Sequence, residues 1–513
     1  MKGVAMAGKY AVPEEIRAMR PVGTTVKRQG DGYYVYETKS TSVKVVDEDG
    51  NARWKTKTKS GPCIGKIVPG EGFVPNSERT FEGEITAFQY GTFQLALSRS
   101  ARTLERLQAV FDKRDAVRIY SLACLFVVLR MRGMRDVSRR FCASVLSLMW
   151  PSARMGKDSV SRLFEDLGER AGRQTAFQQS LIDSSSHTVA LDCHAVACTT
   201  LKRDPLSAWE YKRQKLASPQ LNLVTAYDVE DGGPLCSEMM NGNEIDCSVL
   251  EALFGRFAFS DTLFIASRGF NTEADKALMT SDGNSYIVEM VPGRDDYQGV
   301  YDRFEVDHRQ FFVSDDKGCA TVIYYGVFDE DGVRRACFVD SLMADAERTT
   351  YAHNFARGKE GYTEEGLAAS EKDFGLLILE CSDPTMSARE IFDAHQAAWN
   401  FETFYDYVKR ELDFDAFCQK DYAKTQGLAF VFHVASMIYS EVVLSLEGTD
   451  VSLSEAMDTL SDVMFVRNRG GLSMRNETKE VRELSKRIGL DLGEGIKRVA
   501  EIEAANASLA GIR

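Results

Sequence analysis

Residues 188–192 read Thr-Val-Ala-Leu-Asp, a short apolar run that ends on an acidic residue. Such a run predicts a buried strand, and a second one follows at Leu221–Ala226. A turn at Glu230–Gly233 then reverses the chain, a helix is predicted at Ile245–Phe257, and a third buried strand is predicted at Thr262–Ala266. Antiparallel strands followed by a helix and another strand indicate an α/β protein with a mixed sheet.

Further strand patterns recur between residues 281 and 382, and they predict a β-rich insertion. The patterns lie at Ser285–Glu289, Phe311–Val313, Ala320–Tyr325 and Arg335–Val339. Residues 20–95 also have the alternation that is typical of strands, whereas residues 100–180 have the three- and four-residue apolar spacing that is typical of helices.

The charge of the chain is unevenly distributed. The net charge of −13 over 513 residues argues by itself against a nucleic-acid partner. However, residues 1–60 contain 12 basic and 7 acidic residues, and residues 98–180 contain 16 and 8. We therefore expect an acidic body with basic modules that could bind DNA. The simpler alternative is that the basic helices only expose their charged faces to solvent.

Composition restricts the compartment as well. The 11 cysteines include no Cys-x-x-Cys pair, which favours a reducing cytosol over a disulfide framework or a zinc site. The apolar segment Gly427–Val443 is predicted to be a buried helix, because it is short and contains polar residues, so we expect no membrane association.

A long helix is predicted over Ser387–Leu412, and it has a regular polar spacing. Offsets of three, four and seven residues return to one face of a helix, so His395, Ala398, Glu402 and Lys409 form one stripe. A carboxylate on this stripe could hold a metal ion while the lysine two turns later contacts a phosphate. Considered alone, such a pair is more often solvated, just as an aspartate after a strand is more often a turn residue or a cap.

Together, these features resemble the insertion-sequence DDE transposases, in the branch with a β-strand insertion before the last catalytic glutamate. The matching residues are Asp192, Pro219-Gln220, Gly242-Asn243 with Asp246, Arg268-Gly269-Phe270, and the helix residues Trp399, Phe401, Glu402, Tyr405 and Lys409. Further likenesses at Tyr33–Tyr36, Ile64–Ile67 and Ser473–Lys479 extend the resemblance over nearly the whole chain.

The resemblance implies an RNase H-like core that cuts and joins DNA with two Mg²⁺ or Mn²⁺ ions. Two ions activate the attacking oxygen and stabilise the leaving oxygen, and hard carboxylate ligands suit them. By this resemblance Asp192 and Glu402 are metal ligands, and Ser267 occupies the position of the second catalytic aspartate. The resemblance places Lys409 on a DNA phosphate. Further DNA contacts are expected at Arg268, His395, Lys212, Arg213 and Lys215.

The chain departs from the family pattern at three positions of the site. Ser267 replaces the aspartate before Arg-Gly, and His395 and Ala398 replace the tyrosine and arginine of the helix motif. A serine is a poor metal ligand, and loss of the arginine removes a bidentate phosphate contact. Three other acids lie near Ser267 in the sequence, and each is an imperfect substitute for the missing carboxylate: Asp261, Glu273 and Asp275.

Three hypotheses about function follow. The first is a transposase that acts, as a dimer on DNA, at the inverted repeats of its own element and at target DNA. The second is a catalytically silent, transposase-derived DNA-binding protein, which Ser267 and Ala398 favour. The third is a different metal-dependent nuclease on the same fold. The resemblance also implies a bacterial cytoplasmic protein that joins the nucleoid when it is on DNA.

Six ranges are predicted along the chain. They are an N-terminal β-rich module (1–97), a helical basic region for binding DNA ends (98–182), the first part of the RNase H-like core (183–280), the β-rich insertion (281–382), the second part of the core with the catalytic helix (383–446), and a C-terminal helical region (447–513).

Overall fold

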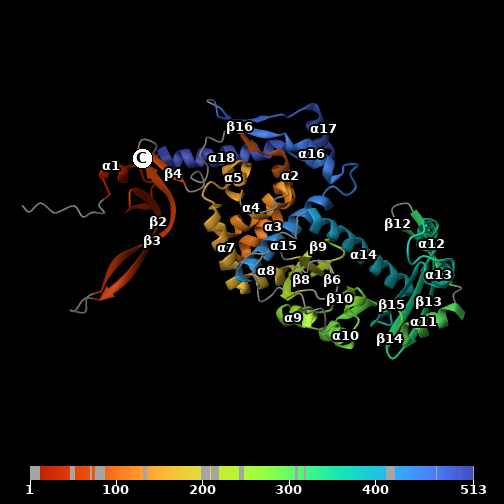
Figure 1. Ribbon diagram of the computed structural model, residues 1–513. Coiled ribbons are helices and arrows are strands. Elements are labelled where there is room, and N and C mark those ends of the chain that lie inside the picture. The colour runs from red at the N-terminus through yellow and green to blue at the C-terminus, as the bar shows by residue number, and fades with distance from the viewer. Residues whose placement is uncertain are drawn as a thin grey trace, which may run out of the picture. The chain divides into compact units, whose positions relative to one another are not determined.

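The computed structural model describes residues 12–46, 52–69, 72–75, 87–130, 136–197, 208–209, 219–241, 248–306, 310–316, 319–411, 422–468 and 471–511 (Figure 1). In some of these segments only the backbone is described, among them residues 39–46, 52–59 and 400–411. The contacts divide the chain into two compact units, Met1–Glu169 with Val434–Arg513, and Arg170–His433. Each unit is described by itself.

The first unit begins with a four-stranded antiparallel sheet. Its strands, in spatial order, are β1 (Thr24–Gln29), β2 (Gly32–Val46), β3 (Ala52–Val68) and β4 (Gly72–Pro75), and helix α1 (Glu14–Ala18) precedes them. Ile16 of α1 packs with Val26, Val35 and Ile67 of the sheet in a small buried core. Strands β2 and β3 extend beyond this core as a long two-stranded ribbon (Figure 1).

The rest of the first unit is mainly helical. Its helices are α2 (Gly91–Arg99), α3 (Ala101–Val110), α4 (Lys113–Leu129), α5 (Val137–Cys142), α6 (Val145–Met149), α7 (Lys157–Glu169), α16 (Leu453–Ser461), α17 (Lys479–Arg487) and α18 (Leu492–Gly511). The C-terminal part also contains strands β16 (Met464–Asn468) and β17 (Gly471–Arg475), which form a sheet with β5 (Ala87–Gln89). The buried Tyr90 hydroxyl, just before α2, donates a hydrogen bond to the carbonyl of Leu492 at the start of α18.

Helix α15 (Tyr422–Leu444) is the apolar helix that the sequence predicts near Gly427–Val443. By length and composition, Ala423–Leu444 could cross a membrane, and 78% of its most apolar window is buried inside the protein. Burial of this extent is typical of a core helix, so the structure gives this segment a packing role.

One carboxyl group of α15 makes stability depend on pH. Thr103 donates its hydroxyl to both oxygens of Glu441, at 2.9 Å each, and burial raises the pKa of Glu441 from 4.5 to about 7. Between these values the folded state holds more protons than the unfolded state, so stability falls as pH rises from about 4.5 to 7. We expect Glu441→Gln to remove this slope and to stabilise the protein at pH 8 by about 1–3 kcal/mol.

Thermal or urea unfolding at pH 5 and pH 8 measures the effect of Glu441→Gln. The exposed Glu447, on the chain just after α15, provides the matched control Glu447→Gln, which should leave the slope unchanged. A slope that persists in Glu441→Gln would contradict the assignment.

The second unit is built on a ten-stranded mixed sheet, which confirms the predicted α/β class. The spatial order is β12-β13-β14-β15-β11-β10-β6-β8-β7, and β9 also pairs with β8. The strands are β6 (Thr188–Ala197), β7 (Ala208–Trp209), β8 (Pro219–Asp228), β9 (Gly233–Asn241), β10 (Leu263–Ala266), β11 (Ser285–Glu289), β12 (Gln310–Asp316), β13 (Cys319–Glu330), β14 (Val333–Asp340) and β15 (Leu376–Cys381). Strands β6, β10 and β11 are parallel to one another, and the remaining pairs are antiparallel.

Helices cover both faces of this sheet. They are α8 (Ala171–Ile182), α9 (Ser248–Arg256), α10 (Glu273–Met279), α11 (Asp295–Val306), α12 (Ser341–Ala356), α13 (Glu364–Ser370) and α14 (Ala388–Glu411). On one face Ile391 and Phe392 of α14 pack against Ile287 and Phe338. On the other face Val300 of α11 packs in a cluster with Cys337 and Ile378. Because neighbouring residues of β14 and β15 point to opposite faces, each strand contributes to both clusters.

The strand at Ser285–Glu289 has the bounds that its pattern predicts, and its place in the sheet is informative. The sequence assigns it to the insertion, but in the structure it is β11 and pairs in parallel with β10. Strand β15 pairs antiparallel with β11 on the other side, so the strands of the insertion continue the same sheet. β11 thereby ends beside β10, where the candidate site lies.

Candidate active site

Three polar residues lie level where strands β10 and β11 end. Ala266 of β10 is opposite Leu191 of β6 and opposite Val288 of β11. The next residues on the three strands are Asp192, Ser267 and Glu289. Level residues on neighbouring parallel strands point to the same face of the sheet. This is the face on which Ile287 packs against α14.

The structure corrects one detail around Asp192. The sequence predicts that the strand stops there, but β6 continues to Ala197 because it keeps pairing with β8. Asp192 is therefore inside β6, at the level where its other neighbour, β10, ends. The pairing of β6 with β10 therefore stops at Leu191, and the side chain of Asp192 lines the pocket on the face that α14 covers.

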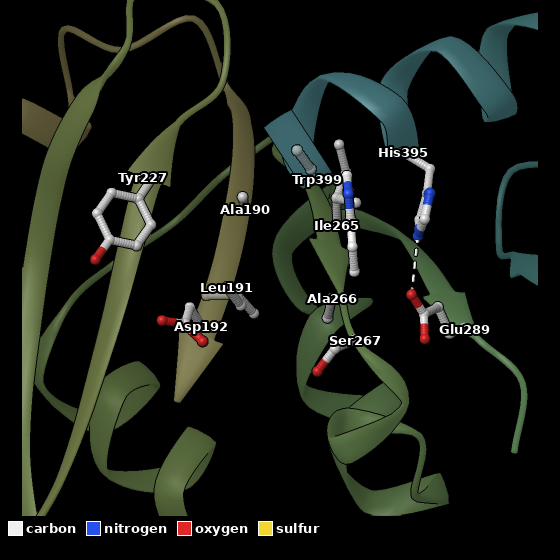
Figure 2. A pocket seen from close by; sticks show the side chains of 11 residues that line it. Ala190, Leu191, Asp192, Tyr227, Ile265, Ala266, Ser267, Glu289, His395 and Trp399 are labelled. Atoms are coloured by element: carbon white, nitrogen blue, oxygen red, sulfur yellow. Dashed lines mark hydrogen bonds and ion pairs between the residues drawn. The ribbon is translucent and has the colours of Figure 1, made fainter. Parts of the chain in front are cut away.

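A pocket occupies this position, between the strand ends and helix α14 (Figure 2). Asp192, Ser267 and His395 all line it, so segments that are far apart in the sequence come together here. Trp399 of α14 lies at the pocket and is 51% exposed. The other lining residues are Ala190, Leu191, Tyr227, Ile265, Ala266, Glu289 and Ala398.

Glu289 and His395 form a polar contact across the pocket (Figure 2). Nε2 of His395 lies 3.1 Å from Oε1 of Glu289, and the side chains are only 11% and 22% exposed. The hydrogen bond from His395 lowers the pKa of Glu289 and outweighs the opposing effect of burial, with further help from the charge and backbone N–H of Arg268. Glu289 is therefore a charged carboxylate at physiological pH, held in place by α14.

The predicted site residues fall into three groups. Asp192, Ser267 and His395 are brought together in the pocket. Arg268 follows Ser267 in a short 3-10 turn, where it is exposed. Of the others, Glu402 and Lys409 are on α14 with side chains outside the described set, and Lys212, Arg213 and Lys215 lie entirely outside the described residues.

The three acids near Ser267 in the sequence do not line the pocket. Asp261 lies before β10, at the opposite end of the strand. Glu273 is 94% exposed and pairs with Lys276 at 3.3 Å. Asp275 is buried, and its second oxygen accepts a hydrogen bond of 2.6 Å from Thr272 at the start of α10.

Glu289 is the carboxylate that sequence reasoning missed. The available signal was that Ser285–Glu289, like Thr188–Asp192, is an apolar strand that ends on an acid. That signal has meaning only once the strand is known to be parallel to β10 and level with it, which the sequence pattern does not reveal.

The pocket contains oxygen donors of the kind that bind divalent cations. Two carboxylates and a hydroxyl are hard oxygen donors, which Mg²⁺ and Mn²⁺ prefer. Within the part of the chain that the structure describes, no group of three His, Cys, Asp or Glu side chains is close enough to hold a metal ion alone. A metal here would need further ligands, and Mg²⁺ commonly takes these from water and substrate phosphates.

Comparisons with known proteins do not assign the chain to a family. No family model and no curated protein matches the chain. Among solved structures, it is similar to a piggyBac transposase in a synaptic complex with hairpin DNA, seen by cryo-EM. The TM-score is 0.37 with 10% sequence identity, over 74% of this chain and 82% of the other.

Proposed function

We propose that the chain is a DNA transposase with an RNase H-like core, which cuts and joins the ends of its own insertion sequence by metal-dependent phosphoryl transfer. The observation that carries the proposal is the meeting of Asp192 and Ser267 at one level of neighbouring parallel strands, facing α14. These are the positions of the first two acids in the resemblance, and α14 is the helix that contains Glu402. Residues of three distant segments converge on one pocket, as this chemistry requires.

Different residues of the site would have different roles in this chemistry. The proposed ions, Mg²⁺ or Mn²⁺, would supply activation of the attacking oxygen and stabilisation of the leaving oxygen. Asp192 and Glu402 would hold them, and Lys409 would neutralise a phosphate of the DNA end. The largely apolar walls contributed by Ala190, Ile265 and Ala398 would limit water around the charged groups, which strengthens their electrostatic effect.

The first unit supports a DNA partner through the ribbon of β2 and β3. The register pairs Lys39 with Lys59, Thr41 with Lys57, Val43 with Lys55 and Val45 with Arg53. Since alternate residues share a face, five basic residues share one face of this ribbon. They recur about every 7 Å along β3. A two-stranded ribbon fits the major groove of DNA, and a basic row can contact phosphates.

The second candidate is a silent transposase-derived protein that binds element ends without cutting them. Ser267 and Ala398 favour it, because both line the pocket and neither provides a charge. The two candidates share DNA binding and differ in metal-dependent cleavage. As a bacterial cytoplasmic protein, either would act on the nucleoid as a dimer.

Replacement of Ser267 by aspartate tests the proposal. Labelled duplexes from the borders of the chain's own gene are incubated with Mg²⁺ or Mn²⁺ and the parent or variant protein. We expect the parent to cut and Ser267→Asp to cut about 10- to 100-fold faster. The substitution adds a charged ligand between Asp192 and Glu289, which already line the pocket. Ser267→Asn, of equal size but neutral, is the matched control and should not accelerate cleavage.

The outcomes separate the candidates. Cleavage by Ser267→Asp alone, with binding by both proteins, would favour the silent candidate. If neither protein binds or cuts border DNA that carries inverted repeats, the proposed function is wrong.

A further inference from the structure

We propose that Glu289 supplies the second metal-binding carboxylate of the site in place of the serine at position 267. The inference rests on the proposed function, because it assumes that the pocket binds divalent metal ions. It assigns a role to a residue that the sequence resemblance does not single out.

The register provides the first argument. Ser267 and Glu289 are level on adjacent parallel strands, and both are on the face that α14 covers. Adjacent strands are about 4.8 Å apart, so the carboxylate has moved by one strand from the expected position. Glutamate is one methylene longer than aspartate, and this extra length directs its carboxylate further from the strand than an aspartate would reach.

Surrounding contacts provide the second argument. Nε2 of His395 lies 3.1 Å from Oε1 of Glu289, and the positive charge of Arg268, at the end of the neighbouring strand, also acts on this carboxylate. A carboxylate has about four acceptor sites, so these contacts leave capacity for a cation. Carboxylate ligands of metals are usually held by such outer hydrogen bonds, which orient them before the metal arrives. His395 is thus a positioning residue, and its replacement of the family's tyrosine coincides with the shift of the acid.

The charge of the pocket provides the third argument. Without Glu289, Asp192 would be the only carboxylate among the residues that line the pocket in the described part of the chain. Two divalent ions would then be held by Asp192 and the proposed ligand Glu402 alone, so two negative charges would face four positive charges. Glu289 and Asp192 lie on either side of Ser267, so a cation above the serine would have a carboxylate on each side (Figure 2).

Binding of Mn²⁺ alone tests the inference without reliance on cleavage. The loss of the electron paramagnetic resonance signal of hydrated Mn²⁺ is followed as the full-length chain is titrated, with and without border DNA. Glu289→Gln, which keeps the size of the side chain and an oxygen for His395, should weaken binding about tenfold or more. Glu273→Gln, a change of the same kind at the exposed carboxylate on α10, should bind as the parent does.

A double variant separates a ligand from a merely structural residue. If Glu289 stands in for the missing aspartate, Ser267→Asp should restore the Mn²⁺ affinity that Glu289→Gln loses. Unfolding midpoints without metal should agree between parent and Glu289→Gln, which excludes loss of the fold as the cause.

Each contrary outcome has a distinct meaning. Normal Mn²⁺ binding by Glu289→Gln, together with loss of binding by Asp192→Asn, would overturn the inference and leave the proposed function intact. Weakened binding that Ser267→Asp does not restore would also overturn it, because Glu289 would then act only by holding α14. Absence of Mn²⁺ binding by the parent, with and without DNA, would overturn the proposed function and this inference with it.

Discussion

Replacement of Asp192 by asparagine is expected to reduce metal-dependent cleavage of border DNA by roughly 10³-fold or more, the scale that loss of a central catalytic group has in other enzymes. The aspartate lies where β10 stops pairing, and it lines the pocket with Ser267 and Glu289. Asparagine has nearly the same shape, so the packing of β6 is preserved while the negative charge is lost. A neutral amide is a poor ligand for Mg²⁺ or Mn²⁺, which prefer carboxylates.

The experiment is best done in two backgrounds, the parent and Ser267→Asp. The loss should appear in whichever protein cuts, and binding to the same DNA should remain. Asp231→Asn, in the exposed turn after β8, is the matched control and should leave cleavage unchanged. Cleavage by Asp192→Asn at the parent rate would place the active site elsewhere.

The second large effect is expected for stability, at Glu380 of β15. This side chain is 3% exposed and accepts a 2.7 Å contact from Lys276, a 3.0 Å contact from Arg335 and a 2.9 Å hydrogen bond from the hydroxyl of Tyr286. Burial alone would raise the pKa of Glu380, but these three partners together lower it. Through these contacts the side chain of Glu380 connects α10, β11, β14 and β15 on the face of the sheet opposite α14.

We expect Glu380→Gln to destabilise the protein by about 2–4 kcal/mol, because two largely buried cations lose their buried counter-charge. Within the described part of the chain, Lys276 keeps only the exposed Glu273 as an ion-pair partner, and Arg335 keeps only Glu330. Urea unfolding at pH 7 measures this. Glu371→Gln, in the exposed pair with Arg348, is the matched control and should cost about 1 kcal/mol or less. Since the pKa of Glu380 is lower in the folded state, the parent should also lose stability as pH falls below about 4.5, and the variant should lose less. A cost below about 1 kcal/mol for Glu380→Gln would contradict this view of the cluster.

Much of the fold was predictable from local pattern. The sequence pattern predicts the strands that begin at Thr188, Ser285 and Leu376, and it predicts the long helix α14. These predictions are possible because the spacing of apolar residues reflects which face of a segment is buried. The site was predictable only in part. Asp192 and Ser267 were named from a resemblance, and their meeting at one level depends on the register between β6 and β10, which no local pattern encodes.

By itself, the sequence determined the α/β fold class and most of the segments that form the sheet, because hydrophobic period is a local property. Asp192 became a candidate through a resemblance that also depends on sequence alone. Tertiary structure alone decided that β6 runs past Asp192, that Ser285–Glu289 belongs beside β10, and that Glu289 reaches the pocket under His395. The physical reason is that parallel strands are joined through long connections. Which residues become neighbours across them depends on the packing of α14 and its companion helices onto the completed sheet.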